Sequence, residues 1–241
     1  YTWWCDRKVV GGGVGGGGMR NGVPVRAVAL LRPHIYTTLK DRLSTRPFWG
    51  TAEKVYAIVQ LLQAVQALHR AGLCHGHLSA DNIGVTSVGR LVLLDGVPAF
   101  KKTTLPDNDP TEYLYYFQKT SYATTTSTEE TPCCLAPERF VSSTTTPEAG
   151  TAANTTVTPA MDIFSVGCLV VEICLNEGSC FDHLGQLLAY AHRDDTAAVQ
   201  QRLGKMESSA LRAAAKHMLS RNPAERLSAT GYLERLEATG Q

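Results

Sequence analysis

Three polar residues in the first half of the chain have types and spacing suited to chemistry: His77, Asn82 and Asp95. Asn82 follows His77 by five residues, and Asp95 follows Asn82 by thirteen. Amide and carboxylate oxygens suit Mg²⁺ as ligands, and an imidazole accepts a proton near neutral pH. The oxygens of Asn82 and Asp95 could therefore hold a magnesium ion. Two structural alternatives stay open, because Asn82 could cap a turn and Asp95 could end a strand.

Short strands and long helices must position these residues. Strand-like runs at 83–85 and 91–94 flank a turn at 87–89. Thr51 is expected to cap a helix that ends near Gly72, because apolar residues follow it at intervals of three and four. That stripe consists of Val55, Ile58, Val59, Leu62, Val65 and Leu68. Further elements are expected at 25–31 (a buried strand) and at 161–175, 183–192, 207–220 and 228–238 (helices).

The composition is that of an ordinary globular protein. The 241 residues are 44% hydrophobic and carry a formal net charge of +1, which gives no general electrostatic reason to expect nucleic acid as a partner. The most apolar segment, 163–175, is too short to span a bilayer and contains Glu172, so no transmembrane helix is expected. Seven cysteines, an odd number, favour reduced thiols. The chain begins at Tyr1 without a signal-peptide pattern, which is compatible with a fragment of a longer protein.

Three segments have biased composition. Residues 11–18 are seven glycines and Val14, and we interpret them as a flexible insertion rather than a phosphate-binding loop, because no strand with a nucleotide-contacting Lys follows. Residues 103–131 and 142–159 are polar and rich in Ser and Thr. We expect both to be loops with partial disorder, since they offer little apolar surface to bury.

Four motifs resemble those of protein kinases. His75 to Asn82 resembles the catalytic loop H-R-D-L-x-x-x-N, with Asp95 at the metal-binding Asp of D-F-G. Ala136-Pro137-Glu138 resembles the A-P-E that ends the activation segment, residues 162–167 resemble D-x-W-S-x-G, and Arg226 stands where an Arg pairs with the A-P-E Glu. The resemblance covers about residues 28–238. It implies an α+β, protein-kinase-like fold, mostly the helical C-terminal lobe, with the small N-terminal lobe largely missing. The expected division is a glycine-rich remnant at 1–24 and the lobe at 25–241.

A narrower resemblance is to the kinase-like domain of the vacuolar-protein-sorting regulatory subunit of class III phosphatidylinositol 3-kinase. The segments that carry it are 43–48, 74–76, 105–110, 136–141, 161–165 and 181–190. This resemblance implies the catalytic lipid kinase and its complex as partners, no nucleic acid, and a cytoplasmic location at the periphery of endosomal and autophagic membranes, reached through the complex.

The chain departs from the kinase pattern where the chemistry occurs. His77 stands at the position of the Asp that takes the proton of the acceptor hydroxyl, Gly76 at that of the Arg that binds a phosphorylated activation loop, and Ser79 at that of a phosphate-neutralising Lys. Asn82 and Asp95, the implied Mg²⁺ and nucleotide positions, are kept, but Asp95-Gly96-Val97 lacks the Phe of D-F-G. Mg²⁺ and ATP are therefore implied for a full-length parent and doubtful for this chain.

Four further residues are implied to be structural. Asp162 is expected to accept backbone hydrogen bonds that set the loop beginning at His75, and Glu138 and Arg226 are expected to form a buried ion pair. These residues favour the fold and indicate nothing about turnover.

Three functions are compatible with this pattern. The first is a pseudokinase-type scaffolding and regulatory domain of the lipid-kinase complex, inactive or strongly impaired because His77 replaces the catalytic Asp. The second is an active serine/threonine protein kinase that transfers the γ-phosphate of ATP. The third is a degenerate product without a stable role. The sequence does not reveal whether nucleotide binds, whether an N-terminal lobe precedes Tyr1, which surface meets the partner, or whether the hydroxyl-rich loops are phosphorylated.

Overall fold

A computed structural model describes residues 3–5, 29–31, 34–96, 103–117, 132–141, 156–176, 178–193 and 195–238. The chain divides into two compact units, residues 1–35 and 36–241. In the first, β1 (Trp3–Cys5) pairs antiparallel with β2 (Ala29–Leu31). The glycine segment 11–18, most of the strand expected at 25–31, and residues 118–131 and 142–155 lie outside the described residues. The division into 1–24 and 25–241 stays a prediction.

A small sheet lies at the start of the second unit. β3 (Thr37–Thr38), β4 (Ile83–Val85) and β5 (Leu91–Leu93) form three antiparallel strands in that order. The strands expected at 83–85 and 91–94 are confirmed, and the turn between them contains Gly89 at a positive φ. α1 (Leu39–Ser44) follows β3 directly and packs against β4 and a short 3₁₀ turn, η1 (Ala80–Asn82). The hairpin thus places Asn82 before one strand and Asp95 after its neighbour.

The long helix α2 (Thr51–Arg70) carries the expected apolar stripe, and Ile58, Leu62 and Val65 are fully buried. Its N-cap is Gly50 rather than Thr51. The helix begins one residue earlier than expected because the Glu53 carboxylate accepts a hydrogen bond from the Gly50 N–H at 2.8 Å. This bond satisfies the backbone donor of Gly50 at the start of the helix.

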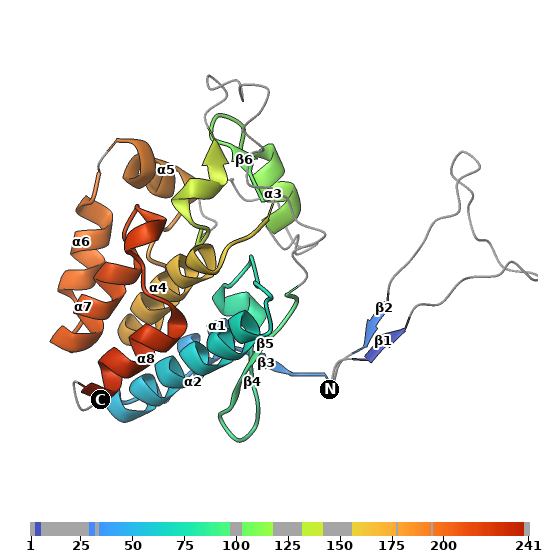
Figure 1. Cartoon of the computed structure of the whole chain (residues 1–241). Helices are drawn as coiled ribbons and strands as arrows, with labels where there is room; N and C mark the ends of the chain where they lie inside the picture. The colour runs from blue at the N-terminus through green and yellow to red at the C-terminus, as the bar shows by residue number, and fades with distance from the viewer. Residues whose placement is uncertain are drawn as a thin grey trace, which may run out of the picture. The chain divides into compact units, whose positions relative to one another are not determined.

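The central helix α4 (Pro159–Leu175) is buried on all sides along most of its length. Residues 161–171 are all buried, as expected for a helix that is apolar around its whole circumference. α2 and α7 (Ser209–Met218) pack against it, and α8 (Ala229–Ala238) packs along α2 (Figure 1). Gly167 permits the close approach, since a Cβ there would lie 2.8 Å from the Cβ of Met218.

The remaining helices complete the helical layer. α5 (Leu184–His192), α7 and α8 confirm the helices expected at 183–192, 207–220 and 228–238 to within about two residues. α6 (Ala197–Gly204) was not expected, because only Val199 and Leu203 form its buried stripe. A 3₁₀ turn, η4 (Pro223–Glu225), joins α7 to α8. The result is the mostly helical α+β architecture that the motifs predict.

The expectation of loops at 103–131 and 142–159 is wrong for residues 105–106, 111–117 and 159. The other described residues of these segments, 103–104, 107–110 and 156–158, lie outside helices and strands as expected. Residues 103–117 contain β6 (Leu105–Pro106), which pairs in parallel with β7 (Phe140–Val141), and α3 (Thr111–Phe117). Leu105, Tyr113 and Phe117 are buried, so a few large side chains order a polar segment. In the second segment, Pro159 already lies in the first turn of α4.

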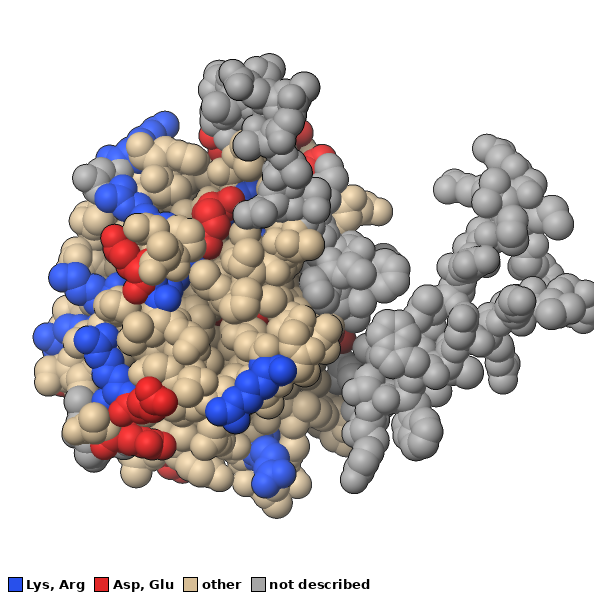
Figure 2. Space-filling model, viewed as in Figure 1, with Lys and Arg blue, Asp and Glu red and all other residues tan. Residues whose placement is uncertain are grey.

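Charges of both signs are interspersed with broad uncharged areas on the face shown in Figure 2. Within the described part of the chain, every helix is too short or too polar to cross a membrane.

Candidate functional site

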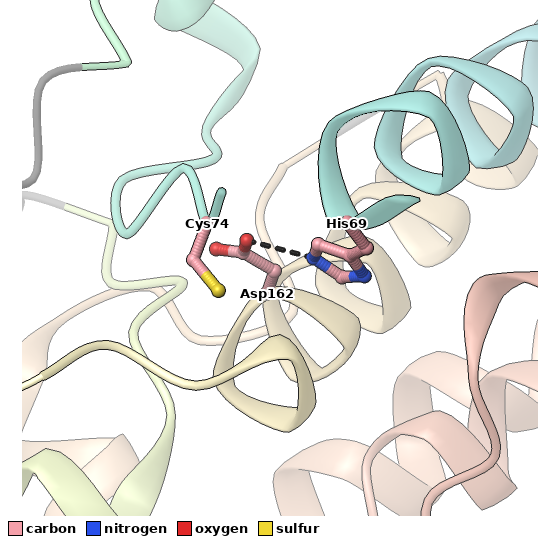
Figure 3. Close-up of side chains that lie close together, drawn as sticks. All are labelled: His69, Cys74 and Asp162. Atoms are coloured by element: carbon pink, nitrogen blue, oxygen red, sulfur yellow. Dashed lines mark hydrogen bonds and ion pairs between the residues drawn. The ribbon is translucent and has the colours of Figure 1, made fainter. Parts of the chain in front are cut away.

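The loop from His75 to Asn82 is held by one buried carboxylate of α4. Asp162 accepts the N–H of His75 on Oδ2 at 2.7 Å and the N–H of Gly76 on Oδ1 at 2.8 Å. The side chain of His69, in the last turn of α2, adds a contact of 3.0 Å from Nε2 to Oδ2 (Figure 3). The carboxylate therefore satisfies two buried backbone donors that have no partner within a helix or a strand.

Figure 3 also shows Cys74 beside this carboxylate. One ligand atom from each of His69, Cys74 and Asp162 lies within 4.8 Å of the others, which is close enough for a metal ion. Burial, together with the nearby Asp162 charge, raises the pKa of the Cys74 thiol to about 11, so the thiol is protonated at neutral pH. Since the carboxylate is already occupied by three donors, the trio is explained by its structural role.

His75 joins this loop to the strand that ends before Asp95. The N–H of His77 donates to Nδ1 of His75 at 3.2 Å, so Nε2 carries the proton that is donated to the carbonyl of Leu94 at 2.9 Å. A Cβ on Gly96 would lie 2.9 Å from Cδ2 of the His75 ring. Only glycine permits the chain after Asp95 to pass this close to the ring.

His77 is buried at the position implied for the catalytic Asp. The amide Nδ2 of Asn82 donates to Nδ1 of His77 at 2.9 Å and to its carbonyl at 3.0 Å. An amide nitrogen only donates, so Nδ1 is the acceptor and Nε2 carries the proton of the neutral ring. The ring of Phe117 in α3 meets the His77 ring edge-on at 5.1 Å between centroids.

Asn82 and Asp95 have features that a bound metal ion would explain. Asn82 is 1% exposed, and its Oδ1 has no hydrogen-bond partner among the described residues. Asp95 has φ +57°, a left-handed conformation that costs a non-glycine residue roughly 1 kcal/mol. The N–H of Leu94 donates to the Asn82 carbonyl at 2.8 Å, so the two residues flank the same end of the hairpin. Their oxygens fit the chemistry of Mg²⁺.

Glu138 and Arg226 form a bidentate ion pair. Nη1 and Nη2 of Arg226 lie 2.7 and 3.0 Å from the two Glu138 oxygens. Arg226 also donates to the carbonyls of Ala160 at 2.9 Å and Ser220 at 2.8 Å, and its guanidinium lies 5.0 Å from the Phe164 ring centroid. The pair therefore ties the A-P-E segment both to α4 and to the link between α7 and α8.

Three residues of this region were missed by the sequence reasoning. Arg139 is 1% exposed and contacts the loop at Gly76, and Phe117 covers His77. Glu172, on α4, has a buried Oε2 without a partner in the described part of the chain, and burial raises its pKa to about 7. An Arg directly after A-P-E was the one available signal. A sequence does not show which side of a segment faces inward.

The fold and the loop define the class of protein. Residues 33–236 match the protein kinase domain, so the chain belongs to the protein kinase family.

Within this family, the chain is similar to proteins named serine/threonine-protein kinase vps15. It is 38% identical over 218 residues to that of Schizosaccharomyces pombe, covering 90% of this chain and 12% of the relative. The identity is 37% over 209 residues with the Arabidopsis thaliana relative and 35% over 210 with that of Saccharomyces cerevisiae, covering 87% of this chain in both cases. The chain spans 12 to 14% of the length of these relatives, and the narrower resemblance seen in the sequence is thereby confirmed.

Proposed function

We propose that this chain is a kinase-like scaffolding and regulatory domain of a class III phosphatidylinositol 3-kinase complex in endosomal sorting and autophagy. The similarity to vps15 proteins supports the complex. The observation that carries the scaffolding role is the state of His77, whose acceptor nitrogen is taken by Asn82.

A general base needs a lone pair that reaches the acceptor hydroxyl. In neutral His77, Nδ1 holds the only ring lone pair, and it lies 2.9 Å from the Asn82 amide. The other nitrogen carries a proton and can only donate. A positioned base contributes roughly 10²–10⁴-fold in rate, so its loss leaves transfer strongly impaired.

Nucleotide binding is a separate matter from transfer. We propose that Asn82 Oδ1 and the Asp95 carboxylate hold Mg²⁺ when the parent protein binds ATP. The ion would neutralise the phosphate oxygens. The unpartnered buried oxygen of Asn82 and the left-handed Asp95 support this assignment. In this role nucleotide stabilises the domain and is not consumed.

The proposed partner is the catalytic lipid kinase, and the proposed location is the surface of endosomal and autophagic membranes, reached through the complex. A pull-down tests the partner. The tagged chain, co-expressed with the catalytic lipid kinase, is expected to retain it. Lys216→Ala, at an exposed position of α7, serves as the surface control variant. Failure to recover the lipid kinase with the chain, or with the longest form of its gene product, would contradict the assignment.

Phosphate transfer is tested with Mg²⁺ and γ-labelled ATP on that longest form. The native protein is expected to label substrate no faster than Asp95→Ala, while a fluorescent ATP analogue binds the native protein and not Asn82→Ala. Robust transfer that disappears in His77→Ala would establish the alternative, an active serine/threonine kinase. The relatives are named serine/threonine-protein kinases, which favours that alternative.

A further inference from the structure

Arg139 is the largest fully buried side chain in the described part of the chain. It ends the 3₁₀ turn η3 (Pro137–Arg139), directly after Glu138. A buried guanidinium needs several hydrogen-bond acceptors or an aromatic face, because it loses its hydration. Burial lowers the pKa of Arg139 to about 10, so it stays charged at neutral pH.

The acceptors of Arg139 come from segments far apart in the chain. Nη1 donates to the carbonyl of Gly76 in the catalytic loop at 2.5 Å, and Nε donates to the carbonyl of Thr103 at 2.9 Å. The guanidinium lies 4.7 Å from the centroid of the Phe117 ring. One side chain thus connects the catalytic loop, the segment before β6 and the end of α3.

Phe117 continues this contact to His77. Phe117 is 6% exposed, and its ring centroid lies 5.1 Å from that of the His77 ring. The aromatic side chain therefore contacts both the imidazole of His77 and the guanidinium of Arg139. Tyr113, one turn earlier on α3, stacks on Phe117 at 6.1 Å and donates from its hydroxyl to the carbonyl of Pro132 at 3.0 Å. α3 is therefore packed over the loop at His77.

Gly76 has no side chain, so the guanidinium at this point of the loop comes from Arg139 instead. Its φ is +72°, and its carbonyl accepts from Arg139. In kinases with Arg at this position, the loop supplies the cation and the activation segment supplies a phosphate. Here Arg139, directly after the A-P-E residues, supplies the cation and the loop supplies a carbonyl, so the contact contains no phosphate.

We propose that Arg139 and Phe117 form a built-in latch that keeps α3 closed over His77 without phosphorylation. Arg139 is a positioning residue, since it acts on His77 through Phe117. The latch closes the position where a protein hydroxyl would approach the loop. All of its residues lie within this chain, so the latch holds whether or not the lipid-kinase complex forms.

Hydrogen exchange followed by mass spectrometry tests the latch. Arg139→Met keeps an unbranched apolar side chain and removes the hydrogen-bond donors, and Phe117→Leu keeps an apolar side chain and removes the ring. Loss of a charge-assisted hydrogen bond is expected to speed exchange in 75–82 and 111–117 on the order of 10- to 100-fold, while exchange in 161–171 of α4 stays unchanged. Arg139→Lys, which keeps the charge but cannot span both carbonyls, is expected to restore part of the protection.

Two matched controls come from the same chain. Arg46 lies 5.6 Å from the Phe48 ring in an exposed pair, and Tyr115 is 80% exposed on α3 itself. Arg46→Met and Tyr115→Leu are expected to leave exchange at 75–82 unchanged. Treating the native protein with phosphatase is also expected to change nothing.

Three results would overturn the latch. One is unchanged local exchange in both Arg139→Met and Phe117→Leu. Another is an equal rise in the exchange of 161–171 in α4, seen also in the milder Arg139→Lys. That result would show that Arg139 contributes only to general packing of the core. The third is a phosphatase-dependent opening of 111–117.

Discussion

The two sides of the loop from His75 to Asn82 differ in how completely their polar groups are paired. On the side that faces α4, Asp162 accepts the N–H groups of His75 and Gly76, and both oxygens of Glu138 contact Arg226. On the side that faces the hairpin, Asn82 keeps an oxygen without a described partner and Asp95 is left-handed. The first side stabilises the fold whatever the chemistry is. On the second side, the buried Asn82 oxygen carries an unmet hydrogen-bonding cost, which a bound cation would offset.

Breaking the ion pair on the anchored side should have the largest effect. Arg226→Met leaves the Glu138 carboxylate without its partner in a partly buried place, and we expect a loss of about 3–5 kcal/mol in the free energy of unfolding. Urea denaturation of the chain measures it. The matched surface variant, Arg202→Met, breaks an exposed pair with Asp182 and should cost under about 1 kcal/mol. Equal losses in the two variants would remove the distinction between anchor and surface.

The packing of α4 against α7 offers a second way to weaken the anchored side. Gly167→Ala places a methyl group 2.8 Å from the Cβ of Met218, and overpacking of this kind costs about 1–3 kcal/mol. Gly204→Ala is the control, since nothing lies within 4 Å of a Cβ there. The thermal midpoint should fall for Gly167→Ala only. An unchanged midpoint would show that α7 can move away without cost.

Glu172 sharpens the comparison, because it is a poorly paired group on the helix that anchors the loop. Burial, with a further contribution from Asp81, raises its pKa from 4.5 to about 7. The folded state therefore prefers the protonated carboxyl, so this contribution is full below about pH 4.5 and is lost as the pH rises through 7. At pH 8, Glu172→Gln should be more stable than the native protein by about 1–3 kcal/mol.

Chemical denaturation of Glu172→Gln at pH 4.5 and pH 8 checks this sign. The gain should vanish at the lower pH, and the exposed control Glu234→Gln should show no such dependence. A gain of equal size at both values would point to better packing instead of lost ionisation.

The smallest effect is expected at the exposed end of the loop. Lys40 and Asp81 form a pair of 3.3 Å with both side chains well exposed, so Lys40→Ala should change stability by about 0.2–1 kcal/mol. High salt should reduce the difference further. A larger, salt-independent loss in denaturation experiments would mean that α1 depends on this contact.

The anchored side was accessible from sequence, and the opposite side only in part. Asp162, Glu138 and Arg226 occur in motifs whose order is legible along the chain, and the stripe of α2 follows from its apolar period. The ordering of 103–117 was not accessible, because it depends on Tyr113 and Phe117 meeting residues from distant segments. The inward direction of Arg139 was hidden for the same reason: an Arg is exposed in most proteins unless tertiary contacts dictate otherwise.

The burial of α4 has a consequence for biosynthesis. Its partners lie on both sides in the chain: α2 precedes it, while α7 and the turn η4 follow it. When a nascent polypeptide has emerged from the ribosome only as far as residue 175, part of the apolar surface of α4 is still exposed to water. Such surfaces recruit chaperones or aggregate. The core of the second unit can close only after the helices beyond residue 209 have been translated.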